Sequence, residues 1–180
     1  YDDLEREGLQ TYGFENKGSY VASYNAPYYQ TYVESYGYTP DAKWVEWRFK
    51  FPMKKDERVE RVAALVEKRY GFHEKHFRST NHLIKEVADD FFDLVDESFS
   101  ELYGTMPFNA ELRKQTIQTF KIMLDKKYIC VVFNKENKLI GFGLTWPSLA
   151  DALKKSNGRA LPFGFLRWLH AIKHPNAVEL

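Results

Sequence analysis

Hydrophobic and polar residues repeat with a helical period in three stretches of the chain. In residues 54–70, 81–103 and 109–124 apolar side chains recur at steps of three and four, with most charged side chains between them. The pattern predicts three amphipathic helices, each with one buried face. Asn109 is a good N-cap for the third helix. The predicted apolar faces consist of Val59, Val62, Ala63, Val66 and Tyr70; of Ile84, Val87, Phe91, Val95 and Leu102; and of Leu112, Ile117, Phe120 and Leu124.

Other stretches have the patterns of strands. Residues 44–51 alternate apolar and polar side chains, which predicts a half-buried strand. Residues 128–133 and 139–146 are almost continuously apolar and flank a polar linker, which predicts a hairpin covered by helices on both faces. Residues 72–77 are a candidate for a further short strand. The hairpin is expected to place six side chains in the core: Ile129, Val131, Phe133, Ile140, Phe142 and Leu144.

Shorter elements complete the pattern. Residues 25–36 carry a helix signal, with Pro27 in the first turn and Gly37 as the stop, and residues 148–155 and 165–173 predict two further helices. The proline and the charged run at residues 52–58 mark the expected boundary between two structural units.

Composition narrows the class of protein. The 180 residues are 44% hydrophobic, enough for one good core or two small half-cores. The 26 basic and 25 acidic residues nearly cancel, so nothing in the charge suggests nucleic acid or an anionic membrane as partner. The aromatic content of 17% is therefore best explained by core and interface packing. The lone Cys130 excludes an internal disulfide and a multi-cysteine metal site, which favours a reducing, cytoplasmic location.

The two ends of the sequence suggest a piece of a longer protein. The chain starts at Tyr1 and has no methionine before Met53, and residues 177–180 look like the opening of a strand. No apolar run approaches the roughly 20 residues that a membrane span needs.

Several segments together resemble the GNAT acyltransferase superfamily. The order of elements in residues 81–146 is similar to the N-terminal half of that fold, and residues 24–29, 36–38 and 44–47 look like its closing element. Residues 6–9, 146–149, 157–159 and 161–164 are similar to bacterial proteins with two such units in tandem. The resemblance implies an α/β (α+β) fold, with a mixed, mostly antiparallel sheet flanked by helices and incomplete at both ends. Residues 1–52 would end a first unit, 53–71 would form a connecting helix, and 72–180 would begin a second unit.

The resemblance also implies a function and a site. The parent protein would transfer an acyl group from acyl-CoA, with acetyl-CoA as co-substrate, to a small-molecule or protein amine. Asn25, Tyr28 and Tyr29 would contact the cofactor arm, and Tyr32 would protonate the departing thiolate. The alternative interpretation is that these tyrosines only pack a helix against a sheet.

The pyrophosphate loop of a GNAT domain, Arg/Gln-x-x-Gly-x-Gly/Ala, is not found. Residues 10–15 fail at the last position, where Glu15 places a carboxylate, and residues 138–143 start with a lysine inside a predicted strand. Phosphates need consecutive backbone N–H groups and a helix N-terminus, so the chain alone is not expected to bind acetyl-CoA tightly. A non-catalytic GNAT-like binding or regulatory module is the alternative function.

Three other features give weaker hypotheses. His73 and His76 lack a third ligand, so no metal site is expected. The acidic residues of the helix at 81–103 form either a solvated face or a site that attracts an amine. Unpaired edges on the strands at 44–51 and 139–146 predict either one composite sheet or a homodimer.

Overall fold

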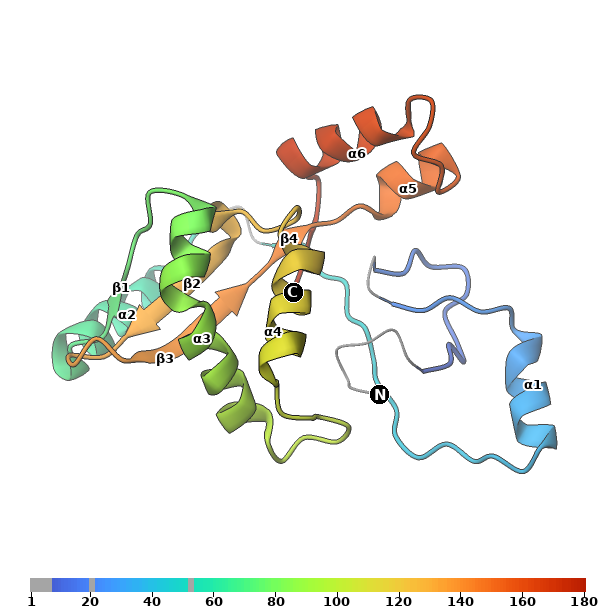
Figure 1. Ribbon diagram of the computed structural model, residues 1–180, viewed down its shortest axis with the longest axis horizontal. Helices are drawn as coiled ribbons and strands as arrows, with labels where there is room; N and C mark the ends of the chain where they lie inside the picture. The colour runs from blue at the N-terminus through green and yellow to red at the C-terminus, as the bar shows by residue number, and fades with distance from the viewer. Residues whose placement is uncertain (1–7, 20–21, 52–53) are drawn as a thin grey trace.

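The structure is a computed structural model that describes residues 8–19, 22–51 and 54–180, and it confirms the mixed α+β class (Figure 1). The helices are α1 (Tyr28–Ser35), α2 (Glu57–Tyr70), α3 (Thr80–Phe99), α4 (Ala110–Phe120), α5 (Ala150–Ser156) and α6 (Gly164–Lys173). The strands are β1 (His73–Glu74), β2 (Ile129–Phe133), β3 (Leu139–Leu144), β4 (Trp146–Pro147) and β5 (Val178–Glu179).

The predicted hairpin is the centre of the main sheet. The strand order is β1-β2-β3 and both pairings are antiparallel, with Val131 opposite Phe142 and a register irregularity between Val132 and Phe133. In the connecting turn, the Asn134 side-chain oxygen accepts hydrogen bonds from the backbone N–H of Glu136 and of Lys138, at 3.1 and 2.9 Å. Local turn chemistry therefore sets the hairpin.

α3 and α4 begin at the capping residues that their sequences provide. Ser79 Oγ accepts from the backbone N–H of His82 at 3.1 Å, and Asn109 Oδ1 accepts from that of Leu112 at 2.9 Å. α3 ends at Phe99, so Leu102, predicted to lie on its buried face, is 54% exposed. Beyond the helix end, the Thr105 hydroxyl lies 2.7 Å from the carbonyl oxygens of both Phe99 and Leu102 and can donate its one hydrogen to either.

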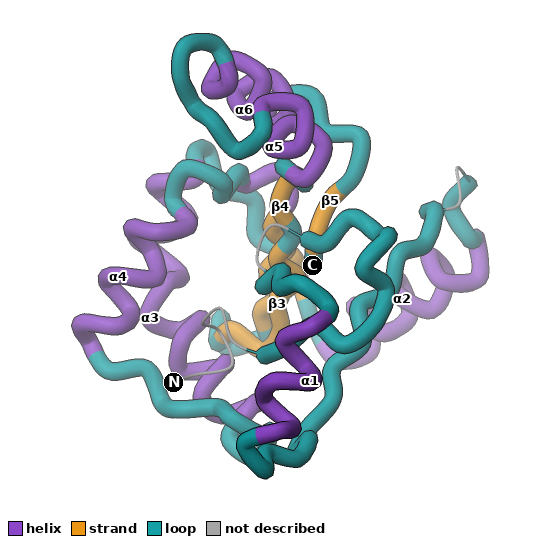
Figure 2. Tube along the Cα trace, turned by 90° about the vertical axis from the view of Figure 1, so that its right-hand side faces the viewer, coloured by secondary structure: helices purple, strands orange, loops and turns teal. Residues whose placement is uncertain are grey.

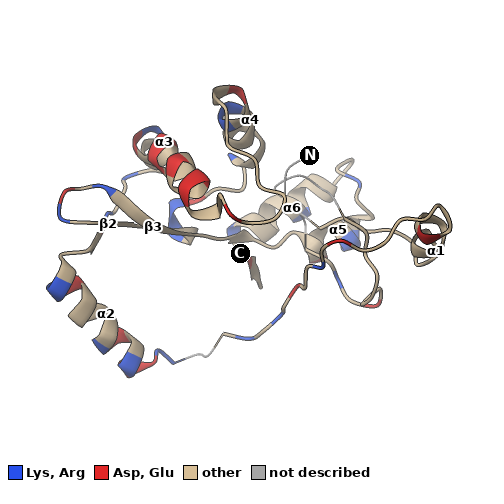
Figure 3. Cartoon of the chain, turned by 90° about the horizontal axis from the view of Figure 1, so that it is seen from below, with Lys and Arg blue, Asp and Glu red and all other residues tan. Residues whose placement is uncertain are grey.

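The core lies between α3 and one face of the sheet. Its buried members include Val87 from α3 with Val131 and Phe133 from β2. The other predicted hairpin residues, Ile129, Ile140, Phe142 and Leu144, are half-buried. The expected cover on both faces is wrong, because α3 and α4 lie on the same side of the sheet (Figure 3) and Cys130 on the opposite face is exposed.

α2 forms as predicted but does not bury its apolar face. Asp56 Oδ1 accepts from the backbone N–H of Arg58 at 2.8 Å, and Gly71, at φ 71°, ends the helix. Nevertheless Val59, Val62 and Tyr70 of the predicted face are 65%, 59% and 48% exposed. The prediction of a buried face is wrong because no described element covers this stripe, and α2 stands apart from the sheet in Figure 3.

Residues 44–51 form no strand, so this prediction is also wrong. Val45, Trp47 and Phe49 are 53%, 84% and 70% exposed. The segment has the alternation of a strand, but no described strand lies beside it to pair with its backbone. Instead Arg48 Nη2 donates to the Lys17 carbonyl at 3.2 Å, and the Ser19 hydroxyl donates to Glu46 at 3.1 Å. The expected composite sheet is therefore not formed.

The C-terminal elements form a small layer of their own. β4 pairs antiparallel with β5, and α5 and α6 lie side by side above these strands (Figure 2). Trp168 Nε1 donates to Ser156 Oγ at 3.0 Å and joins the two helices. Lys17 forms an ion pair with Asp151, and its hydrogen bond and charge lower the pKa of that carboxyl. This contact ties the N-terminal segment to α5.

Among the described residues, buried side chains begin only at Phe77. Residues 8–19, 22–51 and 54–70 are exposed or half-buried throughout. The proline expected at the unit boundary, residue 52, lies outside the described residues. The described part of the chain also contains no helix with both the length and the apolar character of a membrane span.

Candidate functional site

The three tyrosines proposed from the sequence lie together on α1. The Tyr28 ring stacks on that of Tyr29, with centroids 5.0 Å apart, and meets the Tyr32 ring edge-on at 5.5 Å. Tyr28 and Tyr32 are four residues apart, so the helix places them on one face. The rings are 56%, 46% and 61% exposed, respectively. We call this group, Tyr28, Tyr29 and Tyr32, the tyrosine cluster.

Asn25 connects this helix to the preceding segment. Its Oδ1 accepts from the backbone N–H of Gln10 at 2.7 Å, and its Nδ2 donates to the carbonyl groups of Gln10 and Ala26 at 3.2 and 3.1 Å. Both amide hydrogens of the half-buried Asn25 are therefore used within the chain. Only the second lone pair of Asn25 Oδ1 remains to accept a hydrogen bond from a bound molecule. In this structure Asn25 fixes the chain at the start of α1.

The exposed tyrosine rings do not support the interpretation that they only pack α1 against a sheet. α1 contains no buried residue, and Figure 1 shows it apart from the sheet strands. None of the three hydroxyl groups has a hydrogen-bond partner among the described residues. A flat aromatic surface with free hydroxyl groups can stack on a planar group and donate or accept a proton.

Neither glycine segment forms a phosphate cradle. Gly13 lies in a turn closed by a hydrogen bond from the Asn16 N–H to its carbonyl at 2.9 Å, and no described helix begins there. Gly141 and Gly143 lie within β3, opposite Val132 and Cys130. Their backbone is part of the β2–β3 ladder and presents no run of free N–H groups. Residues 139–143 lie inside a strand as predicted, whereas Lys138 precedes it.

A charged cluster that the sequence did not reveal joins α3 to α4. Arg113 Nη2 lies 2.7 Å from Asp93 Oδ1 and 3.1 Å from Asp96 Oδ2, and its Nε donates to the Phe108 carbonyl at 3.1 Å. Asp96 also accepts from the Phe108 N–H at 3.0 Å. The hydrogen bond and charge of Asp93 raise the pKa of Arg113 further. The partners are 17 and 20 residues apart, so helical spacing could not pair them.

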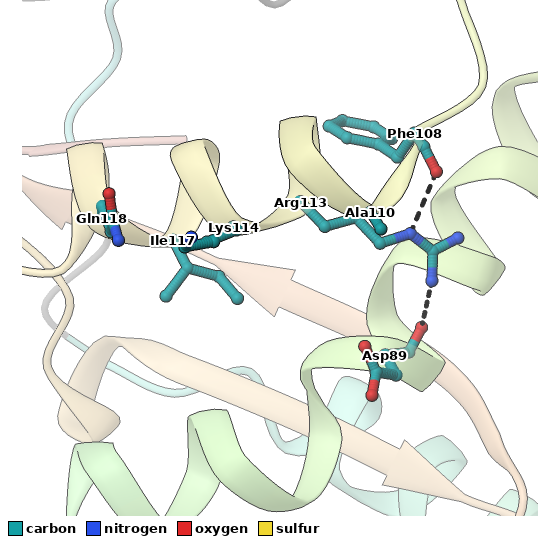
Figure 4. Close-up of a pocket in the computed structure, with 7 residues that line it drawn as sticks. All are labelled: Asp89, Phe108, Ala110, Arg113, Lys114, Ile117 and Gln118. Carbon is teal, nitrogen blue, oxygen red and sulfur yellow. Dashed lines mark hydrogen bonds between the residues drawn. The ribbon is translucent and has the colours of Figure 1, made fainter.

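This cluster forms one wall of an open depression of about 510 Å³ (Figure 4). Figure 4 shows the Arg113 guanidinium between the carbonyl groups of Phe108 and Asp89, the latter at 3.5 Å. Arg113 is therefore held by α3 and the start of α4, and does not point freely into the depression. Its role in the structure is to join the two helices. The depression is lined by Asp89, Phe108, Ala110, Arg113, Lys114, Ile117 and Gln118.

The acidic face of α3 is partly neutralised. Asp93 and Asp96 pair with Arg113, while Asp89, Asp90 and Glu97 remain exposed. This arrangement favours the solvated-face interpretation over an amine-attracting site, because the most enclosed carboxylate already has a cation.

The histidines and the cysteine do not converge on a metal site. The His73 ring stacks on Phe133 at 6.0 Å, and His76 Nδ1 lies 3.9 Å from a Glu74 carboxylate oxygen. Partial burial is the main cause that raises the pKa of the Cys130 thiol, and the charge of Glu74 raises it further. Within the described residues there is no group of three side chains that could hold a metal ion.

No family model, no curated protein and no solved structure matches the chain.

Proposed function

We propose that this chain is part of a GNAT-like N-acyltransferase that moves an acyl group from acyl-CoA to an amine in the cytoplasm. The observation that carries the proposal is the order α3, α4, β2, β3 with both helices on one side of an antiparallel hairpin (Figure 3). The second support is a helix in the preceding segment that presents free tyrosine hydroxyl groups. Residues 1–52 and 72–180 belong, in this proposal, to successive units joined through α2.

The tyrosine cluster is the part of the chain that faces acetyl-CoA in this proposal. Tyr28 and Tyr29 pack against the pantetheine arm, and Asn25 keeps α1 in place beside residues 8–13. The amine nitrogen forms a bond to the thioester carbonyl carbon, the C–S bond breaks, and the thiolate takes the proton of the Tyr32 hydroxyl. The proton lost by the amine returns to the phenolate through solvent. The net products are an amide and free CoA.

A non-catalytic GNAT-like module is the second candidate. The use of both Asn25 amide hydrogens inside the chain favours it, because a cofactor-binding asparagine is expected to keep a donor free. In this case the chain keeps the fold as a binding or regulatory unit, and the tyrosine cluster has no role in chemistry.

Titration with S-acetylpantetheine tests the proposed contact between the tyrosine cluster and the cofactor arm. This compound carries the thioester and the arm but no pyrophosphate. With tyrosine-labelled protein, we expect ring NMR signals of Tyr28, Tyr29 and Tyr32 to shift with millimolar affinity, while those of the exposed Tyr12 and Tyr38 stay in place. Tyrosine-to-phenylalanine variants assign the signals. If the ring signals of the cluster do not shift at up to about 10 mM S-acetylpantetheine, the binding free energy is weaker than roughly −3 kcal/mol and the proposed contact is ruled out.

The chain is expected to have no measurable affinity for acetyl-CoA in the micromolar range. The described residues offer no backbone cradle for the pyrophosphate, so the nucleotide half adds little affinity. Calorimetric titration should give no dissociation constant below about 10 μM, which corresponds to roughly −7 kcal/mol. Coenzyme A lacking the acyl group is the matched control. A tighter value for acetyl-CoA would mean that a phosphate site exists in this chain.

A further inference from the structure

The helix pair α5 and α6 projects from the sheet and is anchored at both ends. It lies between β4 and β5, which pair antiparallel with Trp146 opposite Glu179. The chain therefore leaves the sheet after β4 and returns to it at β5, beside the point where it left. Both Figure 1 and Figure 2 show the two helices at the upper edge of the view, beyond β4.

Backbone contacts fix the turn between the two helices. The Phe165 N–H donates to the Ala160 carbonyl at 2.8 Å. A Cβ on Gly164 would overlap the Arg159 carbonyl oxygen, so the close approach of these two backbone segments requires a glycine. Residues 157–163 are therefore held in one conformation, and the side chains of this turn are presented from a fixed backbone.

The side of α6 that faces away from α5 is apolar and exposed. Arg167 Nη1 donates to the Lys155 carbonyl at 2.6 Å, and the hydrogen bond of Trp168 also points toward α5. The helical period places Leu166 and Leu169 on the opposite side. Together with neighbouring side chains they form a surface that we call the α6 patch, whose members are between 40% and 75% exposed: Leu161, Phe163, Phe165, Leu166 and Leu169.

From residue 152 to residue 178 the chain carries positive charge and no negative charge. This stretch contains five of the 26 lysine and arginine residues and none of the 25 acidic residues. All five are exposed, and none forms a salt bridge with another described residue. The near-neutral total charge thus hides a local excess of positive charge, made up of Lys154, Lys155, Arg159, Arg167 and Lys173.

An exposed apolar patch bordered by basic side chains matches the surface of an anionic bilayer. Arg159 precedes the α6 patch, and Lys173 lies one helical turn beyond Leu169. Large apolar side chains enter the boundary between lipid headgroups and acyl chains, while lysine and arginine are attracted to anionic headgroups. A soluble anionic polymer would use the charge but leave the patch in water. The combination therefore favours a lipid surface.

We propose that the α5–α6 pair docks the protein on an anionic lipid bilayer, with the α6 patch in the interface and the basic side chains at the headgroups. The contact is peripheral, because α6 has ten residues and is too short to cross a bilayer. The cytoplasmic leaflet is anionic, which agrees with the location proposed above. The tyrosine cluster takes no part in this contact, so the docking does not depend on acyl transfer.

Co-sedimentation of the full chain with lipid vesicles tests the proposal. We expect vesicles of phosphatidylcholine with about 30% phosphatidylserine to bind the chain at least about tenfold more tightly than vesicles of phosphatidylcholine alone. Raising the salt to about 0.5 M should weaken the binding, because salt screens the attraction to the headgroups.

Matched variants separate the α6 patch from other exposed side chains. Phe163→Ser is expected to weaken vesicle binding at least about fivefold. Phe49→Ser removes a ring of nearly equal exposure, 70% against 69%, and should change it less than about twofold. Lys173→Gln is expected to weaken it about threefold to fivefold, and Lys85→Gln on α3 less than about twofold. Far-UV circular dichroism checks that each variant keeps its fold.

Three results would overturn the proposal. The first is no binding to the anionic vesicles. The second is an equal loss for Phe163→Ser and Phe49→Ser, because exposed apolar side chains would then act wherever they lie. The third is a loss for Lys173→Gln with none for Phe163→Ser, because the surface would then recognise negative charge alone, as expected for a nucleic acid or an acidic protein.

Discussion

Phe133→Ala is expected to lower the free energy of unfolding by about 3–5 kcal/mol, the usual cost of removing a buried phenylalanine ring. Phe133 is 6% exposed and packs in the cluster that joins α3 to the sheet with Val87, Val131 and Leu139. Loss of the ring leaves a cavity that these β-branched and leucine side chains cannot fill without moving the hairpin. Denaturant titration of the full chain, followed by far-UV circular dichroism, measures the change.

Phe163→Ala is the matched control for this variant. The same atoms are removed, but Phe163 is 69% exposed, so the change should stay within about 0.5 kcal/mol. A loss below 1 kcal/mol for Phe133→Ala would contradict the assignment of the core.

Arg113→Met is expected to cost about 1.5–3 kcal/mol, the range for hydrogen bonds to charged groups. The substitution keeps the apolar stem near Phe92 but leaves Asp96, whose side chain is 23% exposed, without its cation. Asp93 is 68% exposed and should contribute little, because water screens its ion pair. A double-mutant cycle with Asp96→Asn, measured by denaturant titration, isolates the coupling between Arg113 and Asp96.

Arg78→Met is the control for the loss of a positive charge. Arg78 is exposed, and its replacement should change stability by less than about 0.5 kcal/mol. If Arg113→Met behaves like Arg78→Met, or if the cycle gives no coupling energy with Asp96, the cluster does not join α3 to α4 in the way described.

Local sequence signals predicted the helices and strands better than they predicted which parts of the chain bury their apolar faces. Asn109 and the polar turn at residues 134–138 act within a few residues, so the sequence predicted the start of α4 and the hairpin directly. The Ser79 cap of α3 also acts locally but was not predicted. The apolar stripe of α2 and the alternation at residues 44–51 are equally clear in the sequence. Their partners, however, would have to come from elsewhere in a fold, and periodicity cannot tell whether such a partner is present.

In the candidate site too, the sequence predicted local contacts but not long-range ones. The contact of Tyr28 with Tyr32 follows from helical spacing and could be predicted. The hydrogen bonds of Asn25 to Gln10 bridge 15 residues, and those of Arg113 bridge 17 and 20, so no local pattern gives them. Whether a polar side chain is free for a ligand or used within the chain thus depends on long-range contacts.

The central claim is that, among the described residues, tight packing is confined to those from Phe77 onward, while residues 44–51 and α2 keep exposed apolar faces. Hydrogen–deuterium exchange of the full chain, resolved by peptide, tests this claim most directly. Slow exchange is expected in α3 and β2, whose residues line the core. Exchange in α2 and in residues 44–51 is expected to finish within seconds, because little tertiary contact opposes local opening. Protection of α2 as strong as that of α3 would contradict the account.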